Sequence, residues 1–176
     1  MANDFEVHID LPTITKNIAN IDKFANAVER GIELGIHELG SRMKDKLIEN
    51  MTMYGLATSP LMSAISVDVI GKGIKVSVGE YGMYVEFGTG IVGSENPHPH
   101  PWVYDVNGHG EKGWFYPTDA SDPNPWKHYY NGTLYGWTKG QKARPFMYNT
   151  WLWGTRSATQ IIRKNINAQV KSVGGK

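Results

Sequence analysis

Cysteine is absent from the sequence of 176 residues, so disulfide bonds and thiolate metal ligands are excluded and the fold depends on packing alone. Long apolar runs are also absent, and no stretch approaches the ~20 residues of a membrane-spanning helix. The first residues include acids where a secretion signal needs a basic start. We therefore expect a protein made in a reducing cytoplasm, with no export of its own and no membrane partner.

The sequence also lacks an excess of either positive or negative charge, because the net charge is only +1. This balance gives no overall attraction toward nucleic acid, and no sequence-specific nucleic-acid partner is expected. The charges are nevertheless unevenly distributed: residues 1–90 have 8 basic and 12 acidic side chains, and residues 91–176 have 10 and 5. Such a chain suits head-to-tail contact with copies of itself or with unlike neighbours.

Signatures of catalysis are missing as well. The chain has no glycine-rich phosphate loop, no Gly-x-Ser-x-Gly elbow and no paired helical carboxylates. Histidines could still bind a metal, and four of the six lie in one segment: His98, His100, His109 and His128. Pro99 holds the backbone extended between the first two, so we expect their rings to point apart. We predict no enzymatic activity, no cofactor and no metal site.

A long amphipathic helix is predicted in the N-terminal region, residues 1–53. Its apolar residues recur about every 3.7 positions, close to the helical period. An unbroken helix of this length would exceed the width of a small domain, so either part of it lies on a neighbour or Gly31 and Gly35 let it fold back. The apolar positions are Ile14, Ile18, Ile21, Ala25, Val28, Ile32, Ile36, Leu39, Met43, Leu47 and Met51.

A β-hairpin and a second helix complete the regular elements. In the segment 61–90, two runs that alternate apolar and polar residues flank the turn Gly71-Lys72-Gly73. Residues 141–170 again show helical spacing. The order helix, strands, helix predicts a single α+β domain over residues 1–176, with an antiparallel sheet packed against both helices. The apolar face of the hairpin comprises Ile65, Val67, Val69, Ile74, Val76 and Val78.

Residues 91–140 differ in composition from the rest of the chain, with six of the nine prolines and four of the six tryptophans. Prolines at this density prevent helices, yet the segment is too aromatic for a disordered linker. We expect a long loop or strand-rich insertion that serves as an interaction surface. Its rings could contact protein, stack on sugars or stack on single-stranded nucleic acid. The tryptophans are Trp102, Trp114, Trp126 and Trp137.

Two short motifs bracket this insertion. The first, Tyr84-Val85-Glu86-Phe87-Gly88-Thr89, contains a single acid among aromatic and β-branched residues, and the second is Ala143-Arg144-Pro145-Phe146. A buried charge is tolerated only with a partner. We therefore predict that Glu86 pairs with Arg144, within one chain or between chains.

These two motifs, with the helices beside them, resemble the head-tail joining, or tail completion, proteins of long-tailed, non-contractile bacteriophages. The resemblance covers residues 21–90 and 140–167 and leaves the insertion unexplained. It implies a structural protein of the virion, made in the host bacterial cytoplasm and located at the head–tail junction.

The implied assembly is a six-fold or twelve-fold ring that contacts a neck stopper or connector on one side and a tail terminator or tail tube on the other. The residues that would shape the motif are Tyr84, Glu86, Phe87, Thr89, Arg144 and Phe146. The competing hypothesis is a carbohydrate-binding or host-recognition module that uses the aromatic insertion.

Overall fold

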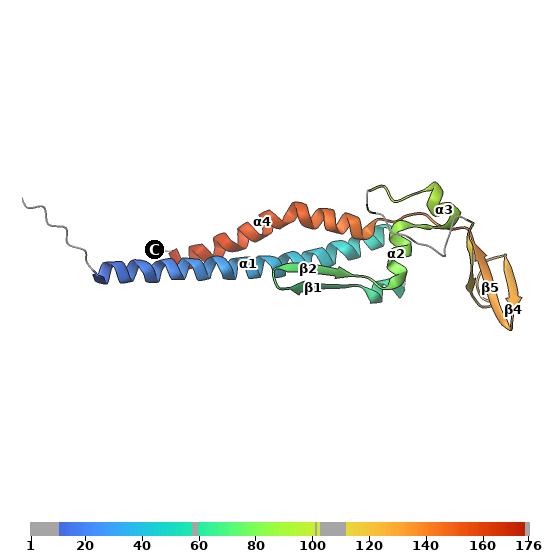
Figure 1. Cartoon of the computed structure of the whole chain (residues 1–176), viewed down its shortest axis with the longest axis horizontal. Helices are drawn as coiled ribbons and strands as arrows, with labels where there is room; N and C mark the ends of the chain where they lie inside the picture. The colour runs from blue at the N-terminus through green and yellow to red at the C-terminus, as the bar shows by residue number, and fades with distance from the viewer. Residues whose placement is uncertain (1–10, 58–59, 101, 103–111, 175–176) are drawn as a thin grey trace, which may run out of the picture.

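Two long antiparallel helices run side by side through most of the elongated molecule (Figure 1). The computed structural model describes residues 11–57, 60–100, 102 and 112–174. Helix α1 spans Leu11–Met53 and helix α4 spans Phe146–Gly174. The expected N-terminal helix is therefore continuous, and it is roughly 64 Å long at ~1.5 Å per residue.

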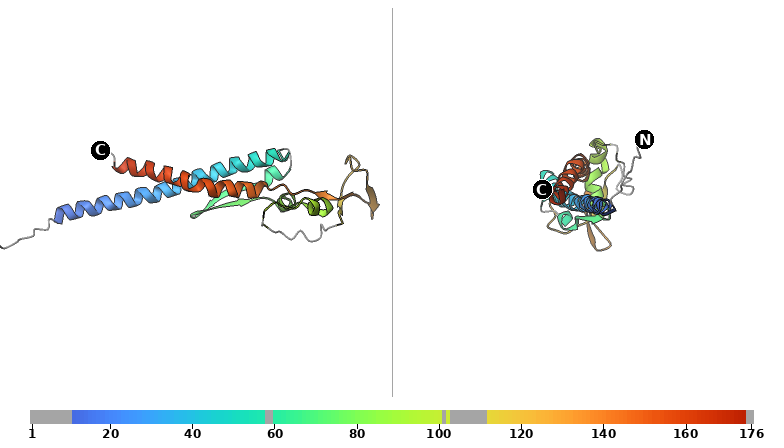
Figure 2. Two further views of the ribbon diagram at one scale, coloured as in Figure 1. Left: turned by 90° about the horizontal axis from the view of Figure 1, so that it is seen from above. Right: turned by 90° about the vertical axis from the view of Figure 1, so that its left-hand side faces the viewer.

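Small residues let the two helices cross at close range (Figure 2). A Cβ atom added to Gly31 would lie 2.5 Å from Ile166 Cα, and one added to Gly35 would lie 2.8 Å from Ile162 Cα. Because neither contact has room for a methyl group, glycine permits the backbones to approach. The expectation that these glycines might fold the helix back is wrong; they admit α4 instead.

The predicted hairpin is present as β1 (Ser66–Ile70) and β2 (Gly73–Ser77), which pair antiparallel with Val67 opposite Val76. It lies along α1 (Figure 1). The buried core forms where the C-terminal half of α1, this hairpin and the start of α4 meet. Its fully packed members are Leu47, Met51, Leu56, Leu61, Val85 and Phe146. The predicted α+β class is confirmed.

The segment around Glu86 is helical. A 3₁₀ turn (η1, Pro60–Ala64) precedes the hairpin, and helix α2 (Glu80–Phe87) follows it. Helix α3 (Gly90–Glu95) comes next, so the expectation that residues 91–140 contain no helix is wrong at their first turn. Prolines begin only at Pro97, which leaves room for this short helix.

The insertion, residues 91–140, also contains strands. This agrees with the strand-rich form, one of the two forms expected for it. Strands β3 (Trp114–Pro117), β4 (Lys127–Tyr130) and β5 (Thr133–Thr138) form an antiparallel sheet in the order β3-β5-β4. We call it the tip sheet, because it lies at the end of the molecule opposite the start of α1 (Figure 1). The short strand β6 (Gly140–Gln141) leads from it toward α4. The tip sheet is separate from the hairpin, whereas the sequence suggested one sheet.

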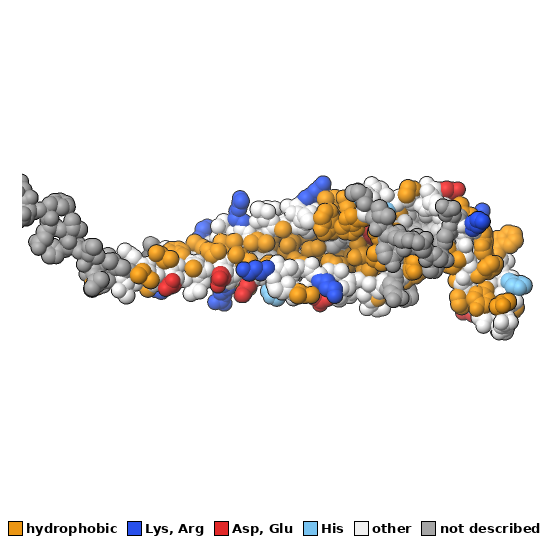
Figure 3. Space-filling model, in the orientation of Figure 1, with side chains coloured by type: hydrophobic (Ala, Val, Ile, Leu, Met, Phe, Trp, Pro, Cys, Tyr) orange, Lys and Arg blue, Asp and Glu red, His pale blue; other side chains and the backbone are white. Residues whose placement is uncertain are grey.

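Helix α1 continues past the end of α4 at the other end of the molecule (Figures 1 and 2). A Cβ added to Gly174, the last residue of α4, would lie 3.4 Å from the Phe24 ring, so the two are level. We call the preceding part of α1 and Phe24 itself, residues 11–24, the α1 overhang. Within it, Ile18 is 55% exposed and Ile21 is 66% exposed. Figure 3 shows apolar side chains along the helices and again on the tip sheet.

Candidate interaction sites

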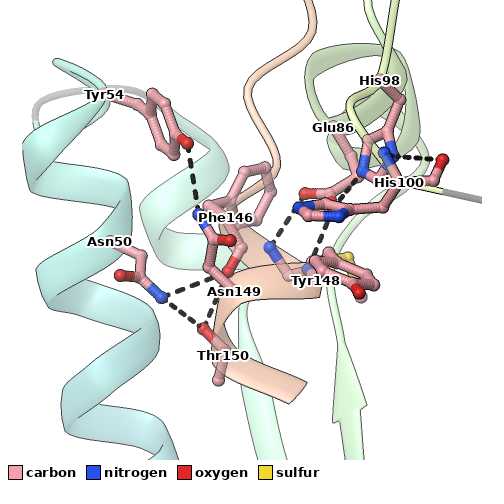
Figure 4. A network of polar contacts seen from close by, with 10 residues as sticks. Asn50, Tyr54, Glu86, His98, His100, Phe146, Tyr148, Asn149 and Thr150 are labelled. Atoms are coloured by element: carbon pink, nitrogen blue, oxygen red, sulfur yellow. Dashed lines mark hydrogen bonds and ion pairs between the residues drawn. The ribbon is translucent and has the colours of Figure 1, made fainter. Parts of the chain in front are cut away.

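The Glu86 carboxylate lies at the centre of a buried polar cluster (Figure 4). Its side chain is 1% exposed. It accepts hydrogen bonds from the backbone N–H groups of Met147 at 2.8 Å and Tyr148 at 2.9 Å, in the first turn of α4. These N–H groups have no partner within the helix, and the helix dipole is positive there. Glu86 therefore caps α4 from a distant part of the chain.

Burial is the dominant influence on the ionisation of this carboxyl. Desolvation raises the pKa of Glu86, against the opposing effect of the Tyr148 and Met147 N–H groups and of His98. The His98 Nε2 atom lies 3.2 Å from Glu86 Oε1. A buried carboxylate with three nitrogen neighbours is well suited to holding segments together.

Within one chain, the predicted Glu86–Arg144 ion pair does not form. The acid's side-chain partner is His98, and its other partners are main-chain N–H groups. Arg144 reaches this region through its backbone, because its N–H donates to the carbonyl oxygens of Val85 at 3.0 Å and of Glu86 at 3.2 Å. The helix N-terminus supplies the positive potential that an arginine was expected to supply.

A short aromatic segment, residues 96–100 and 102, lies against the first turns of α4. We call it the strap. The His98 ring lies 4.8 Å from that of Phe87, and the His100 ring stacks on Tyr148 at 3.6 Å. Trp102 contacts Tyr148 at 4.9 Å and Trp151 at 5.4 Å. The strap thus ties the start of the insertion to α4.

These contacts overturn the expected state of the histidines. The rings of His98 and His100 lie 5.5 Å apart rather than pointing away from each other, and the His98 side chain is only 5% exposed. The backbone bends at Pro99 and His100 instead of staying extended, and both rings turn toward the same helix. Within the described residues, no group of three or more histidine or carboxylate side chains could hold a metal ion. His128 lies on β4, and His109 falls outside the described residues.

Glycines bring the two motifs into backbone contact. Thr89 forms a β-bridge with Gln141, and its side-chain hydroxyl is buried without a hydrogen-bond partner among the described residues. A Cβ on Gly88 would lie 2.6 Å from Ala143 N, and one on Gly140 would lie 1.9 Å from Thr89 O. Both glycines also have φ values in the left-handed region, 73° and 95°. The glycines around Thr89 are therefore required because these two segments of the chain pass close to each other.

A second buried polar group joins the helices beside Glu86 (Figure 4). Asn50 of α1 donates to Thr150 Oγ1 at 3.0 Å, and Thr150 donates to the Phe146 carbonyl at 2.8 Å. Asn149 donates to the Tyr54 hydroxyl at 3.2 Å. Phe146 itself is fully buried. The structure thus brings Glu86, Thr89 and Phe146 together around the start of α4.

The tip sheet exposes aromatic rings on both faces. Its register puts Phe115 opposite Trp137 and Tyr135 opposite His128 on one face, while Trp114 and Thr138 are opposite each other on the other. Four rings of this region are largely exposed: Phe115 at 60%, Trp126 at 70%, Tyr129 at 67% and Tyr130 at 64%. Monomeric proteins rarely leave so many rings uncovered, so this sheet is a candidate interaction surface.

A cleft separates the tip sheet from α2. It has a volume of about 470 Å³. Tyr81 and Tyr84 contribute from α2, and Trp114 and Tyr116 contribute from alternate positions of β3, so Tyr84 and Trp114 of the predicted residues meet here. The remaining lining residues are Thr138, Gly140 and Gln141, and none of the seven is charged. We call this the aromatic cleft.

The turn between β3 and β4 is held by its own side chains. Asp122 accepts hydrogen bonds from the Tyr116 hydroxyl and the Asn124 N–H, each at 2.8 Å, and from Thr118. Hydrogen bonds from Thr118, Asn124 and Tyr116 lower the pKa of Asp122. Asn124 in turn donates to the Trp137 carbonyl at 2.6 Å. Trp126 follows at the surface, so the four predicted tryptophans are divided among the strap, the cleft, this turn and β5.

Comparison with known proteins finds no matching protein-family model, no similar curated protein and no similar solved structure. None of the helices in the described residues is both long and apolar enough to cross a membrane. Sequence reasoning missed the strap and the helix-capping role of Glu86. The signal available for the strap is the run of alternating prolines and rings from Pro97 to Trp102.

Proposed function

We propose that this chain is a structural, non-enzymatic protein of a bacteriophage tail: a tail completion, or head-tail joining, subunit that assembles as a homo-oligomeric ring. Its location would be the head–tail junction of the virion, after synthesis in the host cytoplasm. The ring would have six-fold or twelve-fold symmetry. It would contact a neck stopper or connector on one side and a tail terminator or tail tube on the other.

The observation that carries this proposal is the pair of uncovered apolar surfaces at opposite ends of a narrow molecule. At one end the α1 overhang exposes Ile18 and Ile21, and at the other the tip sheet exposes Phe115 and Trp126. Covering either surface is favourable by roughly 25 cal/mol per Å² of apolar area removed from water. Different surfaces at the two ends favour heterologous contacts, which close into rings when the rotation allows.

The Glu86 cluster supports the same role. It joins α2, the strap and α4 by hydrogen bonds to a buried carboxylate, which suits a rigid assembly unit more than a reaction centre. The resemblance of the two motifs to tail completion proteins gives the specific assignment. The motif residues Glu86 and Phe146 meet at the start of α4, so the two motifs form one structural unit.

Mass measurement of the purified chain tests the proposal directly. Light scattering after gel filtration, followed by electron microscopy with candidate neck and tail-tube proteins, should reveal rings alone or on those partners. A chain that stays monomeric and binds neither neck nor tail protein would contradict it.

The alternative function is a carbohydrate-binding or host-recognition module. Hollows of about 230 Å³ and 300 Å³ on the Phe115 face of the tip sheet favour it, because aromatic rings and His128 form most of their lining. Sugar rings stack on such side chains through their apolar faces. Binding of the monomeric chain to a glycan array, lost with Phe115→Ala, would favour this function over ring assembly.

A further inference from the structure

We propose that the turn Asp122-Pro123-Asn124-Pro125-Trp126 of one copy docks into the aromatic cleft of a second copy. The inference rests on the proposed homo-oligomer and names the contact that would join its neighbouring chains. It combines two features of the tip sheet: a cleft that fits a proline-rich peptide and an exposed proline-rich turn.

The lining of the aromatic cleft defines the chemistry of its ligand. Tyr81 and Tyr84 are three residues apart on α2 and share one face of that helix, while Trp114 and Tyr116 share one face of β3. Four rings from two elements thus line a single volume of about 470 Å³. None of the described lining residues is charged, so we expect an uncharged ligand with flat apolar surfaces.

Proline-rich segments match this description. Grooves lined by tyrosine and tryptophan bind such segments because proline rings pack between aromatic side chains and the extended backbone is already formed before binding. Little conformational entropy is then lost on docking.

The turn presents the matching surface. Pro123, Pro125 and Trp126 are exposed, with Trp126 at 70%. Asn124 fixes their arrangement, because it donates to the Trp137 carbonyl and its Oδ1 accepts the Trp126 N–H at 2.9 Å. A rigid turn with three outward apolar side chains resembles the anchor residues of protein interfaces.

The same hydrogen bonds exclude docking within one chain. Asn124 also donates to the Tyr116 hydroxyl at 3.0 Å, so the turn is anchored to the strand that forms one side of the cleft. It could enter its own cleft only by breaking these bonds. A second copy can receive the turn while these bonds stay intact. Each chain then gives one turn and receives another, a heterologous contact that can close into a ring.

The other proline-rich run is a poorer candidate. Its His98 is held by Glu86 and its His100 stacks on Tyr148, so the strap is already engaged within its own chain. In contrast, the turn Asp122–Trp126 is bonded along its inner side and apolar on its outer side. This difference selects the turn as the occupant.

A peptide with the sequence of residues 120–127, Ala-Ser-Asp-Pro-Asn-Pro-Trp-Lys, tests the proposal in trans. Titrated calorimetrically into the full-length chain, it should bind, and it should shift the chain toward lower mass in light scattering. A peptide with alanine in place of both Pro123 and Pro125 should bind at least tenfold more weakly. Because this change is in the peptide, it does not depend on whether a protein variant folds.

Variants of the full chain locate the binding site. Trp114→Ala should weaken peptide binding at least tenfold, whereas Phe115→Ala, its neighbour on the opposite face of β3, should leave it unchanged. Equal binding by both peptides, or loss of binding with Phe115→Ala alone, would overturn the assignment.

Other outcomes separate this contact from the proposed function. Rings that form while the peptide fails to bind at millimolar concentration would overturn the docking and leave ring assembly intact. Peptide binding to a chain that never self-associates would overturn the copy-to-copy contact. Binding of the trisaccharide chitotriose in the cleft, blocked by Trp114→Ala and without peptide binding, would assign the cleft to carbohydrate instead.

Discussion

The burial of Glu86 shows how one residue can organise three segments of the chain. An ionised carboxylate removed from water costs several kcal/mol unless donors replace the lost solvent. Two N–H groups at the start of α4 and the His98 ring serve as those donors. If the carboxylate is removed, these buried donors have no other hydrogen-bond acceptor. The loss of stability is therefore larger than the net contribution of one hydrogen bond.

Replacing Glu86 by alanine should therefore lower the free energy of unfolding by roughly 3 kcal/mol, because it leaves the Met147 and Tyr148 N–H groups buried without an acceptor. Chemical denaturation followed by circular dichroism measures the change. Glu33→Ala, which removes an exposed acid from α1, is the control and should change stability by less than about 0.5 kcal/mol. Equal effects of the two changes would contradict the capping role of Glu86.

The pKa of the same carboxyl predicts a pH dependence. Because burial raises the pKa of Glu86 above its usual 4.5, the folded state holds this proton more tightly than the unfolded state. The stability contribution linked to this proton is complete below pH 4.5 and is lost as pH rises through the folded-state pKa. The advantage of the natural chain over Glu86→Gln should consequently shrink from pH 4 upward. Denaturation of both proteins at a series of pH values tests the sign; an advantage that grows with pH would show that the hydrogen bonds outweigh burial.

Single-residue reasoning from sequence reached the burial of Glu86 but not its partners. Its apolar neighbours are visible in the sequence, whereas the start of α4 lies 61 residues away, and an N-terminal N–H group has no residue-type signature. Arg144 is the cation of the second motif, which is why the sequence predicts it as the partner of Glu86. Its backbone does contact Glu86, which is why the two motifs meet even though the predicted ion pair is absent.

At the scale of elements, the contact between α1 and α4 depends on the absence of side chains. Gly31 and Gly35 are buried against Ile166 and Ile162, and Ala27 continues the same row one turn earlier. Small residues four apart form one strip on a helix, and this strip lets the opposing backbone approach. Glycine in a helix interior is otherwise unfavourable by about 1 kcal/mol relative to alanine, so its presence here reflects the packing.

Gly31→Ala should then destabilise the protein by about 1–3 kcal/mol, although alanine is the better helix former, because the new methyl group would meet the Ile166 backbone. Gly154→Ala provides the matched comparison. Its methyl group would meet mainly the flexible end of Met43, so we expect little loss or a small gain of stability. Thermal unfolding of both variants decides the matter, and a gain in both would mean that the helices separate easily.

The elements differ in how readily the sequence reveals them. Helix α1 and the hairpin follow from clear periods of apolar residues, and both were predicted close to their observed bounds. Helix α2 was not predicted, because eight residues with Gly82 in the middle give too short a pattern. The tip sheet was recognised only as a strand-rich possibility, since its rings are exposed and show no alternation between buried and polar residues.

For the molecule as a whole, the main feature is length without a thick core. Buried apolar residues gather in the middle, around Leu47 and Leu39, while both ends consist of elements with exposed apolar side chains. A three-stranded sheet of short strands gains much of its stability from whatever covers it. The two ends therefore contribute little to the stability of the isolated chain and are available for contacts with other chains.

The α1 overhang provides the last prediction, which separates assembly from folding. Serine at both Ile18 and Ile21 should leave the free energy of unfolding within about 0.5 kcal/mol of the natural value, because both side chains are exposed in the single chain. The same change should lower the mass measured by light scattering or prevent rings on candidate neck proteins, since it removes apolar surface that a neighbour would cover. Serine at Asn20 and Lys23, exposed polar positions of the same helical turns, is the control and should leave assembly intact. If the Ile18 and Ile21 variant assembles as well as the control, the overhang is not an interface, and the tip sheet alone must join the chains.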